Sequence, residues 1–300
     1  MERKKPKSKT VWRRPPPKWT ELPREITANI LQRLDVEDIL EVAQRVCRTW
    51  RSVCKDPSMW RKIDMSLYDD DDESVMMCEH AVDLSQGQLM DIRLGFFTSD
   101  SLLLYIAERS SQLRYLSLDS CWDDVSGHGL TEAIKRFPLL EELHLFNAEV
   151  PSEAVEVVGR CCPLLKSFSL AALANVPGDP VTKCNKDALA IAKTMTGLQH
   201  LCLVGNKLTN DGLLAILDGC THLESLDLRG CLRVDLEGDI GKRCSQQLKC
   251  VRQPNDSIED LEMYNPGAFD DYGSYTGSDS FEDSGSFSGS DVMSDSDDEY

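Results

Sequence analysis

The second part of the chain repeats the pattern L-x-x-L-x-L, with Ile or Phe at some positions. The first leucines of six copies stand at positions 89, 113, 140, 165, 198 and 223, and a degenerate seventh copy begins at 248. Self-similarity at a period of roughly 25 residues indicates a repeat architecture. The copies are Leu89-Ile92-Leu94, Leu113-Leu116-Leu118, Leu140-Leu143-Leu145, Leu165-Phe168-Leu170, Leu198-Leu201-Leu203 and Leu223-Leu226-Leu228.

Each copy predicts one strand, and the stretches between the copies predict helices near 102–109, 130–137, 154–160, 188–193 and 212–217. A single strand-plus-helix unit cannot bury its own leucines, whereas stacked units share a continuous core. We therefore expect an α/β solenoid over residues 89–252, with the strands on its concave side. The turn-rich segment 176–180 predicts an inserted loop between two repeats.

Strand alternation directs the residues between the leucines outward, onto the concave face. Aromatic, histidine and charged side chains at such positions are typical anchors for a bound protein. Ordinary solvated strand positions are the alternative interpretation. The candidate target-binding residues are Arg93, Tyr115, Asp119, His144, Phe146, His200 and Arg229.

Residues 19–64 predict three short helices. The first carries a stripe at i, i+4 spacing, formed by Leu22, Ile26, Ile30 and Leu34. Asp35 is an N-cap candidate for the second helix, which we expect to continue through Cys47 and Trp50, and Asp56-Pro57 predicts the start of a third. So small a unit holds more large apolar side chains than it can hide, which indicates that one face binds a partner.

The same segment closely resembles the F-box family, and the resemblance extends over roughly residues 15–252. The repeats are similar to the cysteine-containing leucine-rich repeats that accompany F-boxes. The lead-in, 15–23, is similar to a group of small plant F-box/LRR proteins that interact with Skp-like adaptors. The matching motifs are Leu22-Pro23-x-Glu25-Ile26, Ile30-Leu31-x-x-Leu34, Asp38-Ile39-Leu40, Val46-Cys47-Arg48-x-Trp50 and Asp56-Pro57-x-x-Trp60.

This resemblance implies the substrate-recognition subunit of an SCF-type ubiquitin ligase, with no catalytic residue of its own. The F-box would dock a Skp-like adaptor, which joins a cullin scaffold and a RING subunit. The repeats would hold a protein substrate close to the charged ubiquitin carrier and so raise its effective concentration. The implied adaptor-binding residues are Leu22, Pro23, Ile30, Leu31, Leu34, Val46, Cys47 and Trp50.

Charge is distributed unevenly along the chain, whose formal net charge is −18. Residues 1–18 hold eight Lys or Arg and one Glu, a net of +7, whereas residues 253–300 hold fourteen Asp or Glu and no Lys or Arg, a net of −14. We expect both segments to be disordered. The basic arm has the composition of a nuclear localisation signal, although a solvated arm is an equal alternative. An acidic body argues against nucleic-acid binding.

The cysteines form no C-x₂-C pair, and neither a zinc-binding spacing nor a cofactor motif occurs, so no metal or cofactor is expected. No signal peptide or membrane-spanning run is expected either, which predicts an intracellular protein of the nucleus, the cytoplasm or both, without membrane contact. The resulting organisation is a basic arm (1–18), an F-box (19–64), a linker (65–88), leucine-rich repeats (89–252) and an acidic tail (253–300).

The sequence leaves two alternatives to the ligase subunit. One is a leucine-rich-repeat scaffold that is not coupled to ubiquitination, which binding of a Skp-like adaptor would exclude. The other is an independent enzyme, but none of the histidines lies in a catalytic motif, and no nucleophile elbow or phosphate-binding glycine loop occurs.

Overall fold

The computed structural model describes residues 22–119, 124–146, 150–171 and 185–258. The basic arm, residues 259–300 of the acidic tail and the predicted inserted loop lie outside these ranges. What the sequence predicts for them therefore stays a prediction.

The N-terminal region is helical, and both predicted helix starts are confirmed. The Oδ1 atom of Asp35 accepts a hydrogen bond from the Asp38 N–H at 2.7 Å, and Asp56 accepts one from the Ser58 N–H at 3.0 Å. The elements are α1 (Arg24–Leu31), the π-helical η2 (Asp38–Ala43), α2 (Gln44–Val46), α3 (Arg48–Cys54) and the 3₁₀ turn η3 (Pro57–Trp60).

The prediction that the second helix continues through Cys47 and Trp50 is wrong. Cys47 has φ −158° and ψ 172°, an extended conformation that separates α2 from α3. Its Sγ accepts a hydrogen bond from the Trp50 N–H at 3.4 Å and caps the new helix. The break allows α3 to change direction and pack against α1, η2 and α2.

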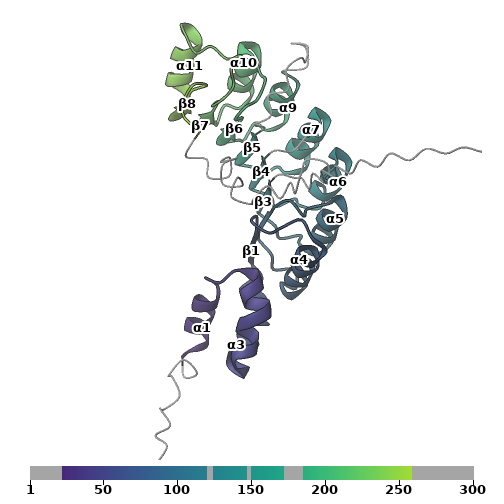
Figure 1. Cartoon of the computed structure of the whole chain (residues 1–300). Coiled ribbons are helices and arrows are strands. Elements are labelled where there is room, and N and C mark those ends of the chain that lie inside the picture. Colours follow the sequence, from purple (N-terminus) through teal and green to yellow (C-terminus); the bar gives the residue numbers. More distant parts are fainter. Residues whose placement is uncertain (1–21, 120–123, 147–149, 172–184, 259–300) are drawn as a thin grey trace, which may run out of the picture. The chain divides into compact units, whose positions relative to one another are not determined.

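Eight strands form one parallel sheet in which each strand pairs with the next along the chain. Helices α4 to α10 lie along one side of these strands (Figure 1). The α/β repeat fold predicted from the leucine pattern is thus confirmed. The strands are β1 (Lys62–Met65), β2 (Asp91–Leu94), β3 (Tyr115–Asp119), β4 (Glu142–Phe146), β5 (Ser167–Ala171), β6 (His200–Cys202), β7 (Ser225–Asp227) and β8 (Cys250–Arg252). The helices between them are α4 (Asp72–Leu84), α5 (Asp100–Arg109), α6 (Gly127–Ile134), α7 (Ser152–Cys161), α9 (Lys186–Thr194), α10 (Asn210–Gly219) and α11 (Asp239–Gln247).

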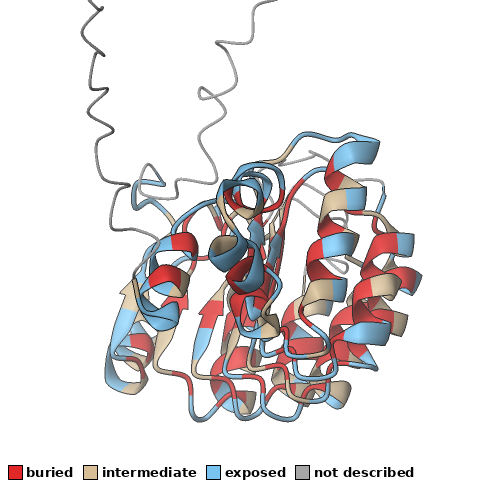
Figure 2. Cartoon of the chain, turned by 90° about the horizontal axis from the view of Figure 1, so that it is seen from below, coloured by how far each residue is buried: buried red, intermediate tan, exposed pale blue. Residues whose placement is uncertain are grey.

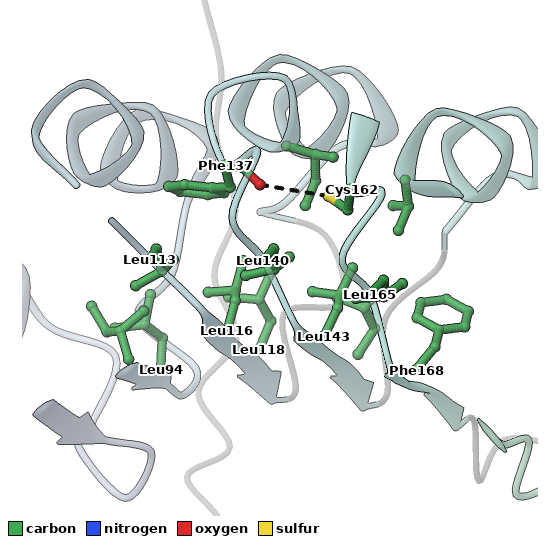
Figure 3. Close-up of a cluster of buried hydrophobic side chains, with 14 of the residues drawn as sticks. Leu94, Leu113, Leu116, Leu118, Phe137, Leu140, Leu143, Cys162, Leu165 and Phe168 are labelled. Carbon is green, nitrogen blue, oxygen red and sulfur yellow. Dashed lines mark hydrogen bonds between the residues drawn. The ribbon is translucent and has the colours of Figure 1, made fainter. Parts of the chain in front are cut away.

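The core lies between the sheet and these helices. Strand register aligns equivalent apolar residues of successive repeats, so that Leu116 pairs with Leu143 and Leu143 with Phe168. These side chains fill the space between strands and helices (Figure 3), and buried residues lie on the helix sides that face the sheet (Figure 2). Because each buried Leu or Phe contributes about 1.5–3 kcal/mol, rows of them hold the stack together.

The predicted linker, 65–88, is not a linker. It contains α4, whose buried residues include Cys78, Ala81 and Val82, and β1 already pairs with β2. The first repeat therefore starts inside the region that was expected to be F-box alone. Its strand follows the same spacing with different residues, because Trp60-x-x-Ile63-x-Met65 replaces L-x-x-L-x-L; all three side chains are buried.

Several buried cysteines bond to backbone carbonyls of a neighbouring repeat. The Sγ–H of Cys162 donates to the Phe137 carbonyl at 3.7 Å (Figure 3), and that of Cys231 donates to the Leu203 carbonyl at 2.9 Å. Burial raises the pKa of both thiols to about 12, so they remain protonated. The cysteines of the described residues are free thiols, and Cys162 and Cys231 are both buried.

Two features of the described ranges bear on other classes of function. None of their helices combines the length and apolar character needed to cross a membrane. Within the same ranges, no three His, Cys, Asp or Glu side chains gather in a way that could hold a metal ion.

Candidate functional site

The N-terminal helices expose two apolar stripes. The first stripe, Ile26, Ile30 and Leu34, is 45%, 43% and 37% exposed. The second stripe, Val42 and Val46, is 56% and 57% exposed. Both follow i, i+4 spacing, so Ile26 and Ile30 lie along one side of α1 and Val42 and Val46 along one side of the second helical segment, while Leu34 lies in the bend after α1. Exposed apolar side chains that line up in this way are characteristic of a surface that a partner covers.

Leu31 is adjacent to this surface in sequence but not in space. It is completely buried, together with Ile39, Leu40 and Ala43. Consecutive helical residues are about 100° apart, which turns Leu31 into the core while Ile30 faces solvent. Of the predicted adaptor-binding residues, Leu31 therefore supports the surface from beneath and is not available for direct contact.

The remaining predicted adaptor residues lie at the edges of the helical segments. Leu22 and Pro23 precede α1, the first half-buried and the second exposed. Cys47 and Trp50 are half-buried at the start of α3, where Trp50 also packs against the core. Their partial exposure is compatible with contact to a partner.

A polar link fixes α1 to α3 and to the segment that follows α3. The Arg24 guanidinium donates to Asp56 at 2.7 Å, to the Ser52 hydroxyl at 3.0 Å and to the Ser52 carbonyl at 3.2 Å. Bonds from Arg24 and Ser58 lower the pKa of Asp56 to about 2. The orientation of the first stripe therefore depends on this link as well as on packing.

A second candidate surface is the helix-free face, the side of the sheet opposite the helices. Two neighbouring strands, β3 and β4, place an aromatic row on it, formed by Tyr115, His144 and Phe146. The Tyr115 and His144 rings are 5.1 Å apart, and His144 stacks on Phe146 with 6.0 Å between the ring centroids. The Arg93 guanidinium lies 4.9 Å from the Tyr115 ring centroid. The structure thus brings four of the predicted target-binding residues together.

Hydrogen bonds fix the orientation of His144 in this row. Its Nδ1 lies 2.7 Å from the Ser169 hydroxyl, and its Nε2 lies 3.5 Å from a Glu142 carboxylate oxygen. Burial lowers the pKa of His144, although the Glu142 carboxylate opposes this shift. The imidazole is therefore mainly neutral at pH 7 and offers a flat, oriented ring to a ligand.

His200 lies outside the aromatic row, beside a shallow pocket of about 170 Å³ on the same face. Its Nδ1 is 2.8 Å from the Ser225 hydroxyl. The pocket also includes Cys202, Asp227 and Arg252. This small polar hollow extends the candidate surface toward the last repeats.

Arg229 is not a surface residue, and its prediction as a target-binding residue is wrong. Its side chain is 2% exposed, donates to Asp227 at 2.6 Å and donates to the Ser257 carbonyl at 2.9 Å. Arg229 lies in a turn beyond β7, where strand alternation no longer applies. Asp119, another predicted residue, is half-buried at the end of β3.

Known proteins share both the helical region and the repeats. A family model described as F-box-like matches residues 19–66. F-box protein SKIP19 of Arabidopsis thaliana is 49% identical over 87% of this chain and 84% of that protein. The chain belongs to the F-box protein family. Putative F-box/LRR-repeat proteins 21 and 22 of the same plant are 46% and 44% identical, covering 81% and 86% of this chain and 83% of each relative.

In this F-box protein, sequence reasoning missed two exposed apolar residues of the stripes. Ile26 belongs to the predicted i, i+4 stripe but not to the predicted adaptor-binding residues, and Val42 belongs to neither set. The signal that could have found Val42 is its spacing of four from Val46, which gives both side chains the same direction.

Proposed function

We propose that this F-box protein is the substrate-recognition subunit of an SCF-type E3 ubiquitin ligase. Its F-box would dock a Skp-like adaptor and, through it, cullin and RING subunits. The observation that carries the proposal is the pair of apolar stripes, which remain exposed although a large core lies directly beneath them. Membership of the F-box family indicates which partner would cover these stripes, since F-box domains in general bind Skp-like adaptors.

The helix-free face supports the second half of this function. Its aromatic row offers rigid side chains with little conformational freedom to lose, and the neighbouring Arg93 and Glu142 provide charge. Such combinations are common among the residues that dominate protein interfaces. A target protein held there would be presented to the ubiquitin carrier by proximity, without a catalytic group from this chain.

Adaptor affinity tests the proposal. The double variant Ile30→Asp/Val46→Asp places a charge in each stripe, and its Kd for a Skp-like adaptor is measured by calorimetry. We expect affinity to fall at least about 30-fold, since burying an uncompensated charge at such positions costs about 2 kcal/mol or more. Leu31→Ala would not serve as a test, because it damages the core.

Leu189→Asp is the matched control for this experiment. Leu189 is 54% exposed on α9, so the variant places a negative charge at an apolar position of the repeats that is about as exposed as Ile30 and Val46. The control should bind the adaptor like the unmodified chain. If the double variant bound the adaptor as tightly as the unmodified chain, or if the unmodified chain did not bind it, the result would instead favour a repeat scaffold that is not coupled to ubiquitination.

A further inference from the structure

A groove of about 1330 Å³ lies between the N-terminal helices and the first repeat. One side is formed by α1 and residues 33–39, and the other by η3, β1 and the loop that leads into α4. The two sides are joined by a hydrogen bond from the Glu37 N–H to the Tyr68 hydroxyl at 3.1 Å. The same core cluster extends through both sides, which fixes the form of the groove.

On α1 itself, the groove and the two isoleucines of the first stripe use different sides, and only Leu34, which follows the helix, belongs to both. Ala28, Asn29 and Gln32 line the groove, whereas Ile26 and Ile30 do not. At 100° per residue, these two sets lie on opposite flanks of the buried side of the helix. A protein bound to the exposed isoleucines would therefore leave the groove accessible on that flank.

The groove is acidic and holds unpaired carboxylates. Seven Asp or Glu line it against three Lys or Arg, and Lys62 already binds Asp91 at 2.8 Å. Among the carboxylates that line the groove, those of four residues have no hydrogen-bond or ion-pair partner within the described residues. They are Glu25, Glu37, Asp69 and Glu73. Leu34 and Leu67, 37% and 92% exposed, add apolar surface to the same lining.

We propose that the groove is the binding site of the chain's own N-terminal arm, residues 1–18. The arm carries a net charge of +7, and the groove lining is negative. Trp12 and neighbouring Trp19 supply apolar side chains that match Leu34 and Leu67. This pairing of opposite charge with apolar contact is independent of the ligase proposal above.

Chain geometry favours the arm over a separate basic protein. The arm ends four residues before Leu22, next to α1, and an extended 18-residue segment reaches up to roughly 60 Å. The eight residues of α1 are only about 12 Å long, so the whole groove is within reach. Tethering gives the arm an effective concentration in the millimolar range, at which even a weak electrostatic contact is populated.

Carbodiimide cross-linking of the unmodified full chain tests the contact directly. This reagent joins a lysine to a carboxylate only when they touch, and mass spectrometry identifies the pair. We expect Lys4, Lys5, Lys7 and Lys9 to be joined to groove carboxylates, with yields that fall as salt screens the attraction. Cross-links confined to the acidic tail, 259–300, would overturn the proposal and assign the arm to the tail.

A competition experiment provides the second measurement. A labelled peptide with the sequence of residues 1–18 is titrated into the full chain and into a variant in which Lys4, Lys5, Lys7 and Lys9 are replaced by Ser. The variant should bind the peptide at least about tenfold more tightly, because its own arm no longer competes. Equal affinity for the two chains would overturn the intramolecular site.

Charge variants of the lysine-replaced chain locate the peptide. Glu37→Gln/Asp69→Asn/Glu73→Gln should weaken peptide binding at least about tenfold, a loss of about 1.4 kcal/mol by the standard conversion. The control Glu153→Gln/Asp211→Asn/Glu237→Gln removes the same charge from exposed positions in the repeats and should leave binding unchanged. Similar losses in both variants would show attraction to net charge alone and would overturn the proposal.

Discussion

Asp56 shows how one half-buried carboxylate can organise a small helical region. It accepts bonds from Arg24 at 2.7 Å, from the Ser58 N–H at 3.0 Å and from the Ser58 hydroxyl at 2.8 Å. It therefore caps η3 and holds α1 at the same time. Since these three donors favour the ionised carboxylate, its pKa falls from 3.8 to about 2.

Acid should weaken this link. Because the folded-state pKa of Asp56 is depressed, its stabilising contribution is complete above about pH 4 and is lost as the pH falls toward about 2. Asp56→Asn should therefore be less stable than the unmodified chain by about 0.5–1 kcal/mol at pH 7, after allowance for solvent screening. Urea unfolding at pH 7, 4 and 2.5 should show the difference shrinking over the last interval; a constant difference would contradict the assignment.

At the scale of elements, neighbouring helices of the repeats approach closely where a small residue permits it. Gly219, the last residue of α10, faces the backbone of Ala192 in α9. A Cβ atom at this glycine would lie 2.2 Å from the Ala192 carbonyl oxygen and 2.8 Å from its Cα. Rigid backbone atoms cannot move aside as a flexible side chain can, so the spacing of the two helices depends on this glycine.

Gly219→Ala should destabilise the protein by about 1–3 kcal/mol, the usual cost of overpacking, despite the better helix propensity of alanine. Gly197→Ala is the matched control, because no atom lies within 4 Å of its added Cβ and its backbone needs no left-handed conformation. The control should be neutral or more stable by about 0.4–1 kcal/mol. Thermal unfolding of both variants provides the measurement, and equal effects would argue against a close α9–α10 contact.

For the whole described molecule, the order of strands determines how stability is shared. Each strand pairs only with its neighbours in sequence, from β1 at one end to β8 at the other. Stacks of this kind gain stability from each unit and from each interface between units, and they open locally. We expect the first repeat to open less readily than the others. Its strand β1 follows η3 directly, and Trp60 at the end of η3 packs in the same core as the F-box helices.

Leu226→Ala should show that each repeat is stabilised mainly by its neighbours. Leu226 is buried in β7 and pairs with Leu201 and Val251 of the adjoining strands. The variant should lose roughly 2–5 kcal/mol of local stability. Hydrogen exchange should accelerate most in β6 to β8 and least in α1 and β1. A uniform acceleration along the chain would show one cooperative unit instead.

The sequence alone determined the repeat fold and the class of the N-terminal region. Leucine spacing and strand alternation are local properties, so the strands from β2 to β7 and the buried rows around Leu116 and Leu143 could be predicted without knowing what packs against them. The aromatic row could be proposed for the same reason, since alternation alone directs Tyr115 and His144 away from the leucines.

Only the tertiary structure decided where local patterns stop applying. Ile30 and Leu31 are equally apolar, and their different exposure depends on where α3 and η2 pack. Arg229 is buried because a turn and the segment at Ser257 enclose it, and Cys47 ends a helix so that α3 can pack back. Burial depends on neighbours that are distant in sequence, and no residue pattern within one segment contains that information.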